Sequence, residues 1–166
     1  MALYSKSVQN AVTILTFIAR RGGGAPITVN EIAKETGVSG PTVAKTVQPL
    51  VKRGVLSSRK GPGGGFVLAL SAKEICLGAI VMAVEGREPF GECMAGLTSC
   101  SEDNICPLHD RWKGVKMALL EFMEKTKLED MVCAVEQMIE EKNQLDSEKK
   151  IDSGIQNFFI SLPLSA

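Results

Sequence analysis

Three cysteines and one histidine lie close together in the second half of the chain: Cys93, Cys100, Cys106 and His109. Thiolate and imidazole are ligands that iron and zinc favour in proteins. The surrounding segment, residues 86–107, is rich in Gly, Ser, Thr, Asp, Asn and Pro and shows no apolar periodicity, so it is predicted to be a loop. We therefore expect a metal-binding loop in this part of the chain.

The spacing of these ligands favours an iron–sulphur cluster over a structural zinc ion. None of the pairs has the C-x2-C spacing that is usual in zinc knuckles. Cys106 and His109 stand at the expected start of a long helix, and a helix N-terminus favours thiolate. Three thiolates and one imidazole can hold a cluster. A zinc site, or free thiols beside a surface histidine, are the alternatives. Cys76 and Cys133 lie among apolar residues and are expected to fill the core.

The charge of the chain is divided between its two halves. Residues 1–73 hold ten Lys or Arg and only two acidic residues, Glu31 and Glu35, which gives a net charge of +8. Residues 74–166 hold nine basic and seventeen acidic residues, which gives −8. A basic half joined to an acidic half indicates that only the first half binds a polyanion. Chance clustering of solvated charge is the alternative.

Several functional classes are disfavoured by the sequence. The longest apolar run, residues 75–84, is too short to span a bilayer, and the N-terminus lacks the features of a secretory signal. We therefore expect a cytoplasmic protein without a membrane partner. The single histidine is the proposed metal ligand, and the glycine run 61–65 leads into a predicted strand and not a helix, unlike a phosphate loop. We do not expect an enzyme.

The first half of the chain has the element order of a winged helix-turn-helix. Apolar residues at helical spacing predict a helix over residues 7–21, and the capping box at 28–31 opens a second. A third helix follows Ser39, its expected N-cap, and Pro49 is expected to kink it or shorten its last turn. Two short apolar runs around the glycine-rich turn predict a β-hairpin at 55–70, which would be the wing.

The remaining chain is predicted to be helical outside the metal-binding loop. Capping boxes at residues 71–74 and 126–129 are expected to open two helices, and Pro107 a long helix between them. Residues 143–166 form either a loose tail or a segment whose apolar end docks on a partner subunit. The long helix is expected to carry an apolar stripe of Leu108, Trp112, Val115, Leu119, Phe122 and Met123.

In a winged helix-turn-helix the third helix enters the DNA major groove by its N-terminal end. Short hydroxyls and lysine on its outward side can contact base edges or phosphates. A winged helix used for protein contacts is the alternative, which the basic charge disfavours. The side chains and glycines predicted to contact double-stranded DNA are Thr28, Ser39, Thr42, Lys45, Thr46, Lys52, Arg59, Lys60, Gly63 and Gly64.

The sequence resembles the Rrf-two family of bacterial winged-helix regulators, which includes IscR and NsrR. The resemblance covers roughly residues 1–140, and its most specific marks are the wing sequence 61–66 and the three cysteines of the loop. It implies a homodimeric repressor or activator that pairs through the long helix. It also implies that the affinity for operator DNA responds to a bound [2Fe-2S] or [4Fe-4S] cluster. It also implies that His109 is the fourth ligand.

The expected fold is mainly α with a small β-hairpin. We expect a cytoplasmic transcription regulator whose cluster, [2Fe-2S] by preference, senses redox state, nitric oxide or iron–sulphur supply. A regulator with a cysteine thiol switch or zinc site is the alternative, and an electron-transfer or structural iron–sulphur module belongs to another class. The expected organisation is a DNA-binding domain at 1–85, a cluster-binding loop at 86–107, dimerisation helices at 108–142 and a C-terminal tail at 143–166.

Overall fold

The computed structural model describes residues 4–21, 24–87, 90 and 108–160, with side chains described as far as residue 144. Cys93, Cys100, Cys106 and Pro107 lie outside these residues, so the predicted loop and the role of Pro107 are outside the described structure. The contacts divide the chain into two units, Met1–Val132 and Cys133–Ala166, which we treat separately. Helices dominate both units, and the described residues contain one antiparallel hairpin, as the sequence predicted.

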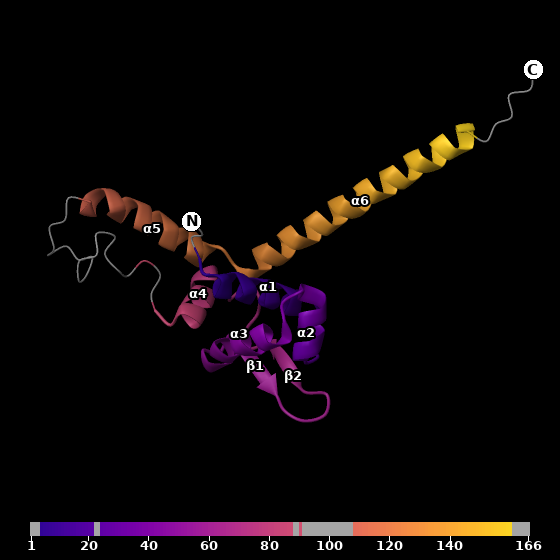
Figure 1. Ribbon diagram of the computed structural model, residues 1–166. Helices are drawn as coiled ribbons and strands as arrows, with labels where there is room; N and C mark the ends of the chain where they lie inside the picture. The colour runs from indigo at the N-terminus through magenta and orange to yellow at the C-terminus, as the bar shows by residue number, and fades with distance from the viewer. Residues whose placement is uncertain (1–3, 22–23, 88–89, 91–107, 161–166) are drawn as a thin grey trace, which may run out of the picture. The chain divides into compact units, whose positions relative to one another are not determined.

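Three helices form the first part of the larger unit (Figure 1). Helix α1 (Lys6–Arg21) buries one face, because Val8, Ala11, Ile14, Leu15 and Ile18 recur at helical spacing. Helix α2 (Val29–Thr36) opens with the predicted capping box of Thr28 and Glu31, in which each side chain bonds the backbone N–H of the other residue. It ends at Gly37, whose φ of 70° favours glycine.

Helix α3 (Gly40–Lys52) is the predicted recognition helix. It runs through Pro49 and ends close to the expected stop at Gly54. Ser39 occupies the N-cap position, as predicted, but its side chain makes no capping bond. Its hydroxyl instead shares a 2.7 Å hydrogen bond with the hydroxyl of Thr42, three residues later on the same face of the helix.

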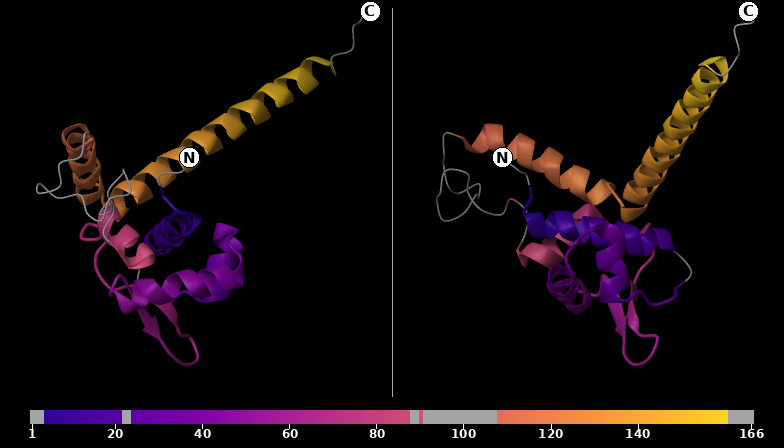
Figure 2. Two further views of the ribbon diagram at one scale, coloured as in Figure 1. Left: turned by 60° about the vertical axis from the view of Figure 1, so that its left-hand side comes forward. Right: turned by 45° about the vertical axis from the view of Figure 1, so that its right-hand side comes forward.

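The wing is formed by strands β1 (Leu56–Arg59) and β2 (Gly65–Leu68), paired from Leu56↔Leu68 to Arg59↔Gly65. Ile27 adds an isolated bridge to the other edge of β2, exchanging two backbone hydrogen bonds of about 3 Å with Phe66. In both views of Figure 2 the hairpin extends away from α1. A Cβ at Gly65 would lie 2.5 Å from the backbone oxygen of Ile27, so this pairing needs glycine there.

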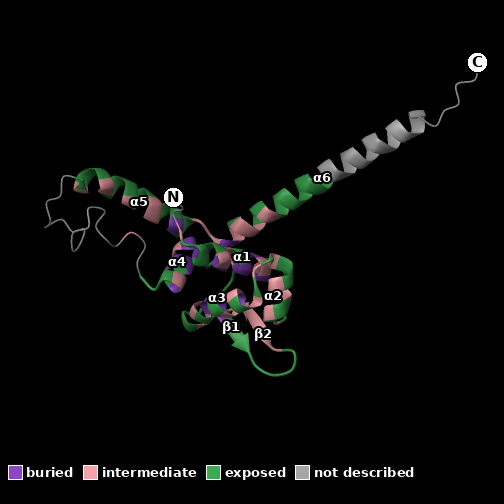
Figure 3. Cartoon of the chain, viewed as in Figure 1, coloured by how far each residue is buried: buried purple, intermediate pink, exposed green. Residues whose placement is uncertain are grey.

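The main core lies where α1, α2, α3, the hairpin and α4 (Leu77–Glu85) meet. Figure 3 shows buried residues on the inner sides of these helices, exposed residues along β1 and the turn of the wing, and partly buried residues along β2. The fully buried large side chains include Ile14, Leu15, Ile32, Leu50 and Ile80. Burying each such side chain contributes about 1.5–3 kcal/mol, so this core holds the recognition helix firmly against α1.

The helix start predicted at residues 71–74 was wrong, and the capping box predicted at 126–129 was also wrong, although a helix does begin at Leu128. Residues 72–74 form a turn in which the Glu74 carboxylate accepts from the Ser71 N–H, and α4 begins only at Leu77. Helix α5 (His109–Lys125) ends with Thr126 as its C-cap, and α6 (Leu128–Ile160) begins two residues later. At that junction Asp130, and not Glu129, caps the chain by accepting from the Lys127 N–H at 2.7 Å. Both segments contain a capping motif, but contacts with a distant segment determine where each helix begins.

Those tertiary contacts are backbone hydrogen bonds between two distant segments. The Leu77 N–H donates to the Thr126 carbonyl at 2.9 Å, and the Leu128 N–H donates to the Ile75 carbonyl at 2.8 Å. The Glu129 N–H also donates to the Ala72 carbonyl at 3.3 Å. The chain between α5 and α6 is therefore paired with the chain that enters α4, and we call this pairing the backbone junction.

The predicted core role of the two remaining cysteines was wrong for Cys133, which is exposed. It lies on α6, in the smaller unit, whose described residues include exposed Met138 and Ile139. Cys76 is half-buried at the N-cap of α4, and its backbone forms an isolated antiparallel β-bridge with the backbone of Lys127. Helix α6 continues to Ile160, so most of the predicted tail is helical.

Candidate functional site

The outward face of the recognition helix presents a short row of polar side chains. Ser39 and Lys45 are exposed and Thr42 is half-buried, and the three are spaced three residues apart on one side of α3. Their hydroxyl and ammonium groups can reach base edges or phosphates from the N-terminal end of the helix. The hydrogen bond between Ser39 and Thr42 fixes the two hydroxyls relative to each other before any DNA is bound.

Thr46 was predicted to lie on this outward side, and that prediction was wrong. It is only 7 % exposed, and its hydroxyl donates to the carbonyl of Thr42 at 2.8 Å. A threonine in a helix commonly satisfies its hydroxyl in this way, one turn back along the backbone. Gln48, which the sequence analysis did not select, is exposed instead. The signal that could have found it is its spacing of three residues from Lys45.

The wing places its basic residues on exposed backbone. Arg59, Lys60 and Gly63 are exposed, and Gly64 is half-buried. A Cβ at Gly64 would lie 2.3 Å from the backbone oxygen of Arg59, so the tip turns too tightly for any other residue. The tight tip holds Arg59 and Lys60 beside bare backbone, where N–H groups and side chains can approach phosphates together.

Thr28, another predicted DNA contact, uses its side chain to begin α2. Its hydroxyl donates to the Glu31 carboxylate at 2.8 Å and accepts from the Glu31 N–H at 3.3 Å. The hydrogen bonds from the Thr28 backbone and hydroxyl hold the pKa of Glu31 below its usual value, and Arg21 lowers it further. The structure thus gives Thr28 a capping role in the absence of DNA.

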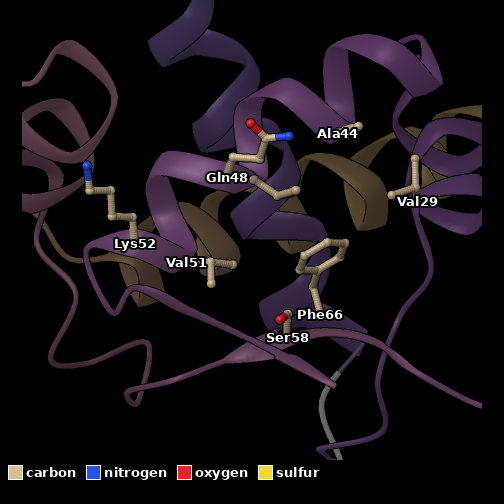
Figure 4. A pocket seen from close by; sticks show the side chains of 8 residues that line it. Val29, Ala44, Gln48, Val51, Lys52, Ser58 and Phe66 are labelled. Atoms are coloured by element: carbon tan, nitrogen blue, oxygen red, sulfur yellow. The ribbon is translucent and has the colours of Figure 1, made fainter. Parts of the chain in front are cut away.

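A hollow of about 430 Å³ separates the recognition helix from the wing (Figure 4). Val29, Val47, Val51 and Phe66 give it apolar walls. Exposed Gln48 and Lys52 lie on its α3 side, and Ser58 on its β1 side. The hollow leaves the recognition helix and the wing as two separate projections, which suits contact with two different parts of a duplex.

Of the four predicted metal ligands, the structure describes only His109. It is the first residue of α5 and is half-buried. The N-cap of this helix, Leu108, makes no side-chain capping bond, so the helix start offers backbone N–H groups to negative charge. Within the described part of the chain no group of three or more metal-ligating side chains comes together.

Helix α5 and its N-cap carry an apolar seam along one side. Leu108, Val115 and Phe122 are exposed in it, and Trp112 and Leu119 are half-buried. Their spacing alternates between four and three residues, as in the a and d positions of a coiled coil. Val115 is 51 % exposed and Phe122 is 52 % exposed. Met123, the last member of the predicted stripe, is instead buried against α1 and α4 residues. The seam leaves large apolar side chains without cover in one chain.

The comparisons with known proteins agree with this architecture. The profile of the Rrf2 family, described as an iron-dependent transcriptional regulator, matches residues 4–134. This chain belongs to the Rrf2 family. The Rrf-two resemblance, the winged-helix fold class and the absence of an enzyme function are thereby confirmed. Rrf2 proteins are transcription regulators that bind DNA, and α3 and the wing carry the residues predicted to contact it.

Curated relatives and solved structures are similar to this chain over most of its length. An HTH-type transcriptional regulator of Aquifex aeolicus is 32% identical over 132 residues, covering 78% of this chain and 91% of the relative. IscR of Pectobacterium atrosepticum is 27% identical and covers 94% of each chain. The structure of CymR, the global cysteine regulator of B. subtilis, has a TM-score of 0.68 at 26% identity, covering 81% of this chain and 98% of that chain. No described helix of this Rrf2 protein is long and apolar enough to cross a membrane.

Proposed function

We propose that this Rrf2 protein is a homodimeric, cytoplasmic regulator whose affinity for its operator is set by an iron–sulphur cluster. The observation that carries the proposal is the arrangement of α5. The helix begins at the predicted ligand His109 and continues as an exposed apolar seam. A ligand and a candidate subunit interface are therefore parts of one rigid element, so events at one can move the other.

The DNA contacts divide between two projections. Ser39, Thr42 and Lys45 face the major groove, while Arg59 and Lys60 with the backbone of Gly63 and Gly64 face phosphates. Lys52 lies between them, beside the hollow. A dimer would place two recognition helices on two half-sites, separated by about one helical turn or a multiple of it. Repressor and activator roles both remain compatible with this mode of binding.

Dimerisation through α5 follows from the exposed seam. Leu108, Val115 and Phe122 are about half exposed and recur every seven residues. A surface of this kind is costly to leave in water, and a second copy of the same helix provides a complementary apolar face.

The residues present fit a cluster held by Cys93, Cys100, Cys106 and His109. The donor set of three thiolates and one imidazole is suited to iron, and His109 stands at an uncapped helix start that favours a negatively charged group. One turn later the indole N–H of Trp112 is buried without a hydrogen-bond partner among the described residues. When bound, the cluster supplies an electron acceptor or a reactive centre for a signal; we favour [2Fe-2S], with [4Fe-4S] as the alternative.

The second candidate is a regulator that uses the same cysteines as a thiol switch or a zinc site. One observation favours it: CymR, which is similar in structure to this chain, is described as the global cysteine regulator of B. subtilis, and that description names no metal or cluster. The two candidates predict different contents for the same residues. Iron and sulphide in the isolated protein support the first, whereas reversible oxidation or zinc supports the second.

The deciding experiment is anaerobic purification followed by absorption spectroscopy and assays for iron, sulphide and zinc. We expect coloured protein, and we expect Cys93→Ala, Cys100→Ala and Cys106→Ala each to lose most of the colour. His109→Ala should perturb the spectrum more mildly, because water or another side chain can replace a neutral ligand. Cys133→Ala is the matched control, since that cysteine is exposed on α6 and outside the ligand pattern.

Operator binding then separates a sensing cluster from a structural one. Loss of the cluster should change affinity for the operator far more than affinity for random DNA. Colourless protein with stoichiometric zinc would contradict the cluster proposal and support the alternative. Equal operator affinity with and without the cluster would reduce it to a structural part.

A further inference from the structure

The hollow between α3 and the wing adjoins the row of side chains that we place in the major groove. Lys45, Gln48 and Lys52 are all exposed and follow one another at spacings of three and four residues, so they lie along one side of α3. The row begins at Lys45 and continues with Gln48 and Lys52, which line the hollow. The hollow is therefore continuous with the surface that is predicted to meet DNA.

The wing supplies the opposite wall of the hollow, and backbone pairing holds this wall in place. Ser58 and Phe66 are directly opposite each other in the hairpin ladder, so their side chains lie on the same face, which is turned toward α3 (Figure 4). Ile27 exchanges backbone hydrogen bonds of about 3 Å with Phe66 from the other edge of β2. Both walls therefore belong to packed or paired elements, so the shape of the hollow is present before DNA binds.

The lining of the hollow combines apolar walls with polar and positively charged groups. Val51 and Phe66 are half-buried apolar residues. Exposed Gln48 and Ser58 carry hydrogen-bond donors, and exposed Lys52 carries a positive charge. None of the described residues that line the hollow is acidic. One strand of DNA has matching chemistry, because its deoxyribose rings present C–H groups between anionic phosphates.

The position of the hollow also matches the course of one DNA strand. Each groove of a duplex is bordered by sugar–phosphate strands. When α3 lies in the major groove and the wing contacts the same duplex, the strand that borders the groove on the side of the wing has to cross the space between them. In this protein that space is the hollow of about 430 Å³.

We propose that the hollow binds one sugar–phosphate strand of the operator. Deoxyribose packs on Val51 and Phe66. Phosphate oxygens accept hydrogen bonds from Gln48, Lys52 and Ser58. This inference rests on the DNA-binding mode proposed above, and it adds Gln48 and Ser58 to the contacts. It also gives the strand a fixed track, which sets how deeply α3 enters the major groove.

Two neighbouring serines of β1 provide a matched pair of variants. Ser58 faces the hollow, whereas Ser57 is also exposed but points to the other face of the hairpin. Ser58→Glu and Ser57→Glu therefore change the net charge equally at adjacent positions. We expect Ser58→Glu to weaken binding to a duplex selected from a random library about tenfold more than Ser57→Glu does, because its carboxylate would stand against a phosphate. Fluorescence anisotropy measures both affinities, and circular dichroism checks that both variants fold.

Neutral phosphates then identify the contact made by Lys52. In a series of the selected duplex, one phosphate at a time is replaced by an uncharged methylphosphonate. We expect several positions where the replacement lowers the affinity of the wild-type protein about tenfold, through loss of charge-assisted hydrogen bonds. Lys52→Met should weaken binding to the unmodified duplex and abolish the sensitivity at one of these positions, because that pair is already broken. Lys6→Met is the control, since Lys6 is exposed on α1 and does not line the hollow, and it should leave the profile unchanged.

Equal weakening by the two serine variants would overturn the inference, because only the net charge would then matter. A methylphosphonate profile of Lys52→Met identical to that of the wild type would overturn it as well. In both cases a relaxed sequence preference of Lys45→Ala would show that the DNA-binding mode itself still holds. Wild-type protein that binds selected and random duplexes equally would overturn that binding mode and this inference with it.

Discussion

The DNA-facing part of the molecule and helix α5 differ in whether their side chains find partners within the same chain. In the first part, the hydroxyls of Ser39, Thr42, Thr46 and Thr28 all bond to groups of the same chain. In α5 the apolar seam is exposed, and the indole N–H of Trp112 has no described partner. The side chains of the first part find their contacts within one chain, whereas α5 leaves apolar side chains exposed and one hydrogen-bond donor without a described partner.

That difference separates two tasks that one regulator has to perform. A surface that reads DNA gains from side chains fixed before binding, because less freedom is then lost on association. A helix that transmits a signal has to respond to what it binds, so its contacts are made with other molecules. The completeness of the first region and the incompleteness of the second are each suited to their proposed role.

The largest effect should come from placing charge in the seam. We expect the double variant Val115→Glu/Phe122→Glu to raise the dimer dissociation constant about a hundredfold or more, because both side chains would be buried in the dimer and carboxylates resist burial. Sedimentation velocity over a range of protein concentrations measures this. Both residues are about half exposed in one chain, so the fold itself should tolerate the change.

Met117→Glu is the matched control for the seam. Met117 is 60 % exposed on the same helix but lies outside the seam spacing. It should leave the dimer dissociation constant close to the wild-type value. Equal weakening by Met117→Glu and by the double variant would mean that the seam is not the subunit interface and that the contrast drawn above is mistaken.

A smaller effect is expected from the DNA-facing side chains, and its pattern sharpens the contrast within that region. Lys45→Ala should cost about 1–3 kcal/mol at the selected operator and relax sequence preference at one position. Arg59→Ala or Lys60→Ala should lower the affinity for all duplexes about equally. Each lost phosphate contact should reduce the slope of the logarithm of the binding constant against the logarithm of the salt concentration by roughly one. Fluorescence anisotropy at several salt concentrations, with selected and random duplexes, distinguishes the two patterns.

Thr46→Val is the control for these DNA-binding variants. Valine has nearly the same shape as threonine. The hydroxyl that the substitution removes is buried, and in the described structure it bonds only within the helix. We expect unchanged sequence preference. A shift in preference as large as that of Lys45→Ala would show that Thr46 turns outward on DNA.

The smallest effect concerns the capping box. Thr28→Ala should lower the free energy of unfolding by about 1 kcal/mol, because the first turn of α2 loses its side-chain acceptor. Glu31 has a lowered pKa in the folded protein, so its stabilising bonds are present above its unfolded pKa and are lost as the pH falls. Urea unfolding at neutral and acidic pH should therefore show a smaller difference between Thr28→Ala and wild type in acid. A constant difference would contradict the coupling of the two residues.

The sequence was most informative where the local pattern and the tertiary structure agree. The boundaries of α1, the Thr28 capping box and the hairpin followed from periodicity, capping chemistry and the glycine-rich turn. The helix start expected at Ser71 and the capping box expected at Thr126 failed because the backbone junction pairs the two segments with each other. Local sequence contains no information about a bond made to a segment fifty residues away.

Side-chain placement was harder to predict than the elements themselves. Thr46 was predicted to contact the groove because its hydroxyl was expected on the outward side of the helix, but that hydroxyl bonds within the helix. Cys133 looked like a core residue because its neighbours are apolar, yet it is exposed. The unsatisfied indole of Trp112 could not be predicted, because it depends on how Phe90 covers the ring.

The backbone junction has a consequence for how this protein can diverge during evolution. The hydrogen bonds that join Ala72, Ile75 and Leu77 to the chain between α5 and α6 are made by peptide groups alone. Ordinary substitutions leave peptide groups in place, and only proline at a donor position removes one. The exposed side chains of both segments can therefore vary without loss of these bonds, whereas Ile75, Leu77 and Leu128 are buried and have to stay apolar. The link between helix α5 and the chain that follows the wing thus tolerates change at its surface.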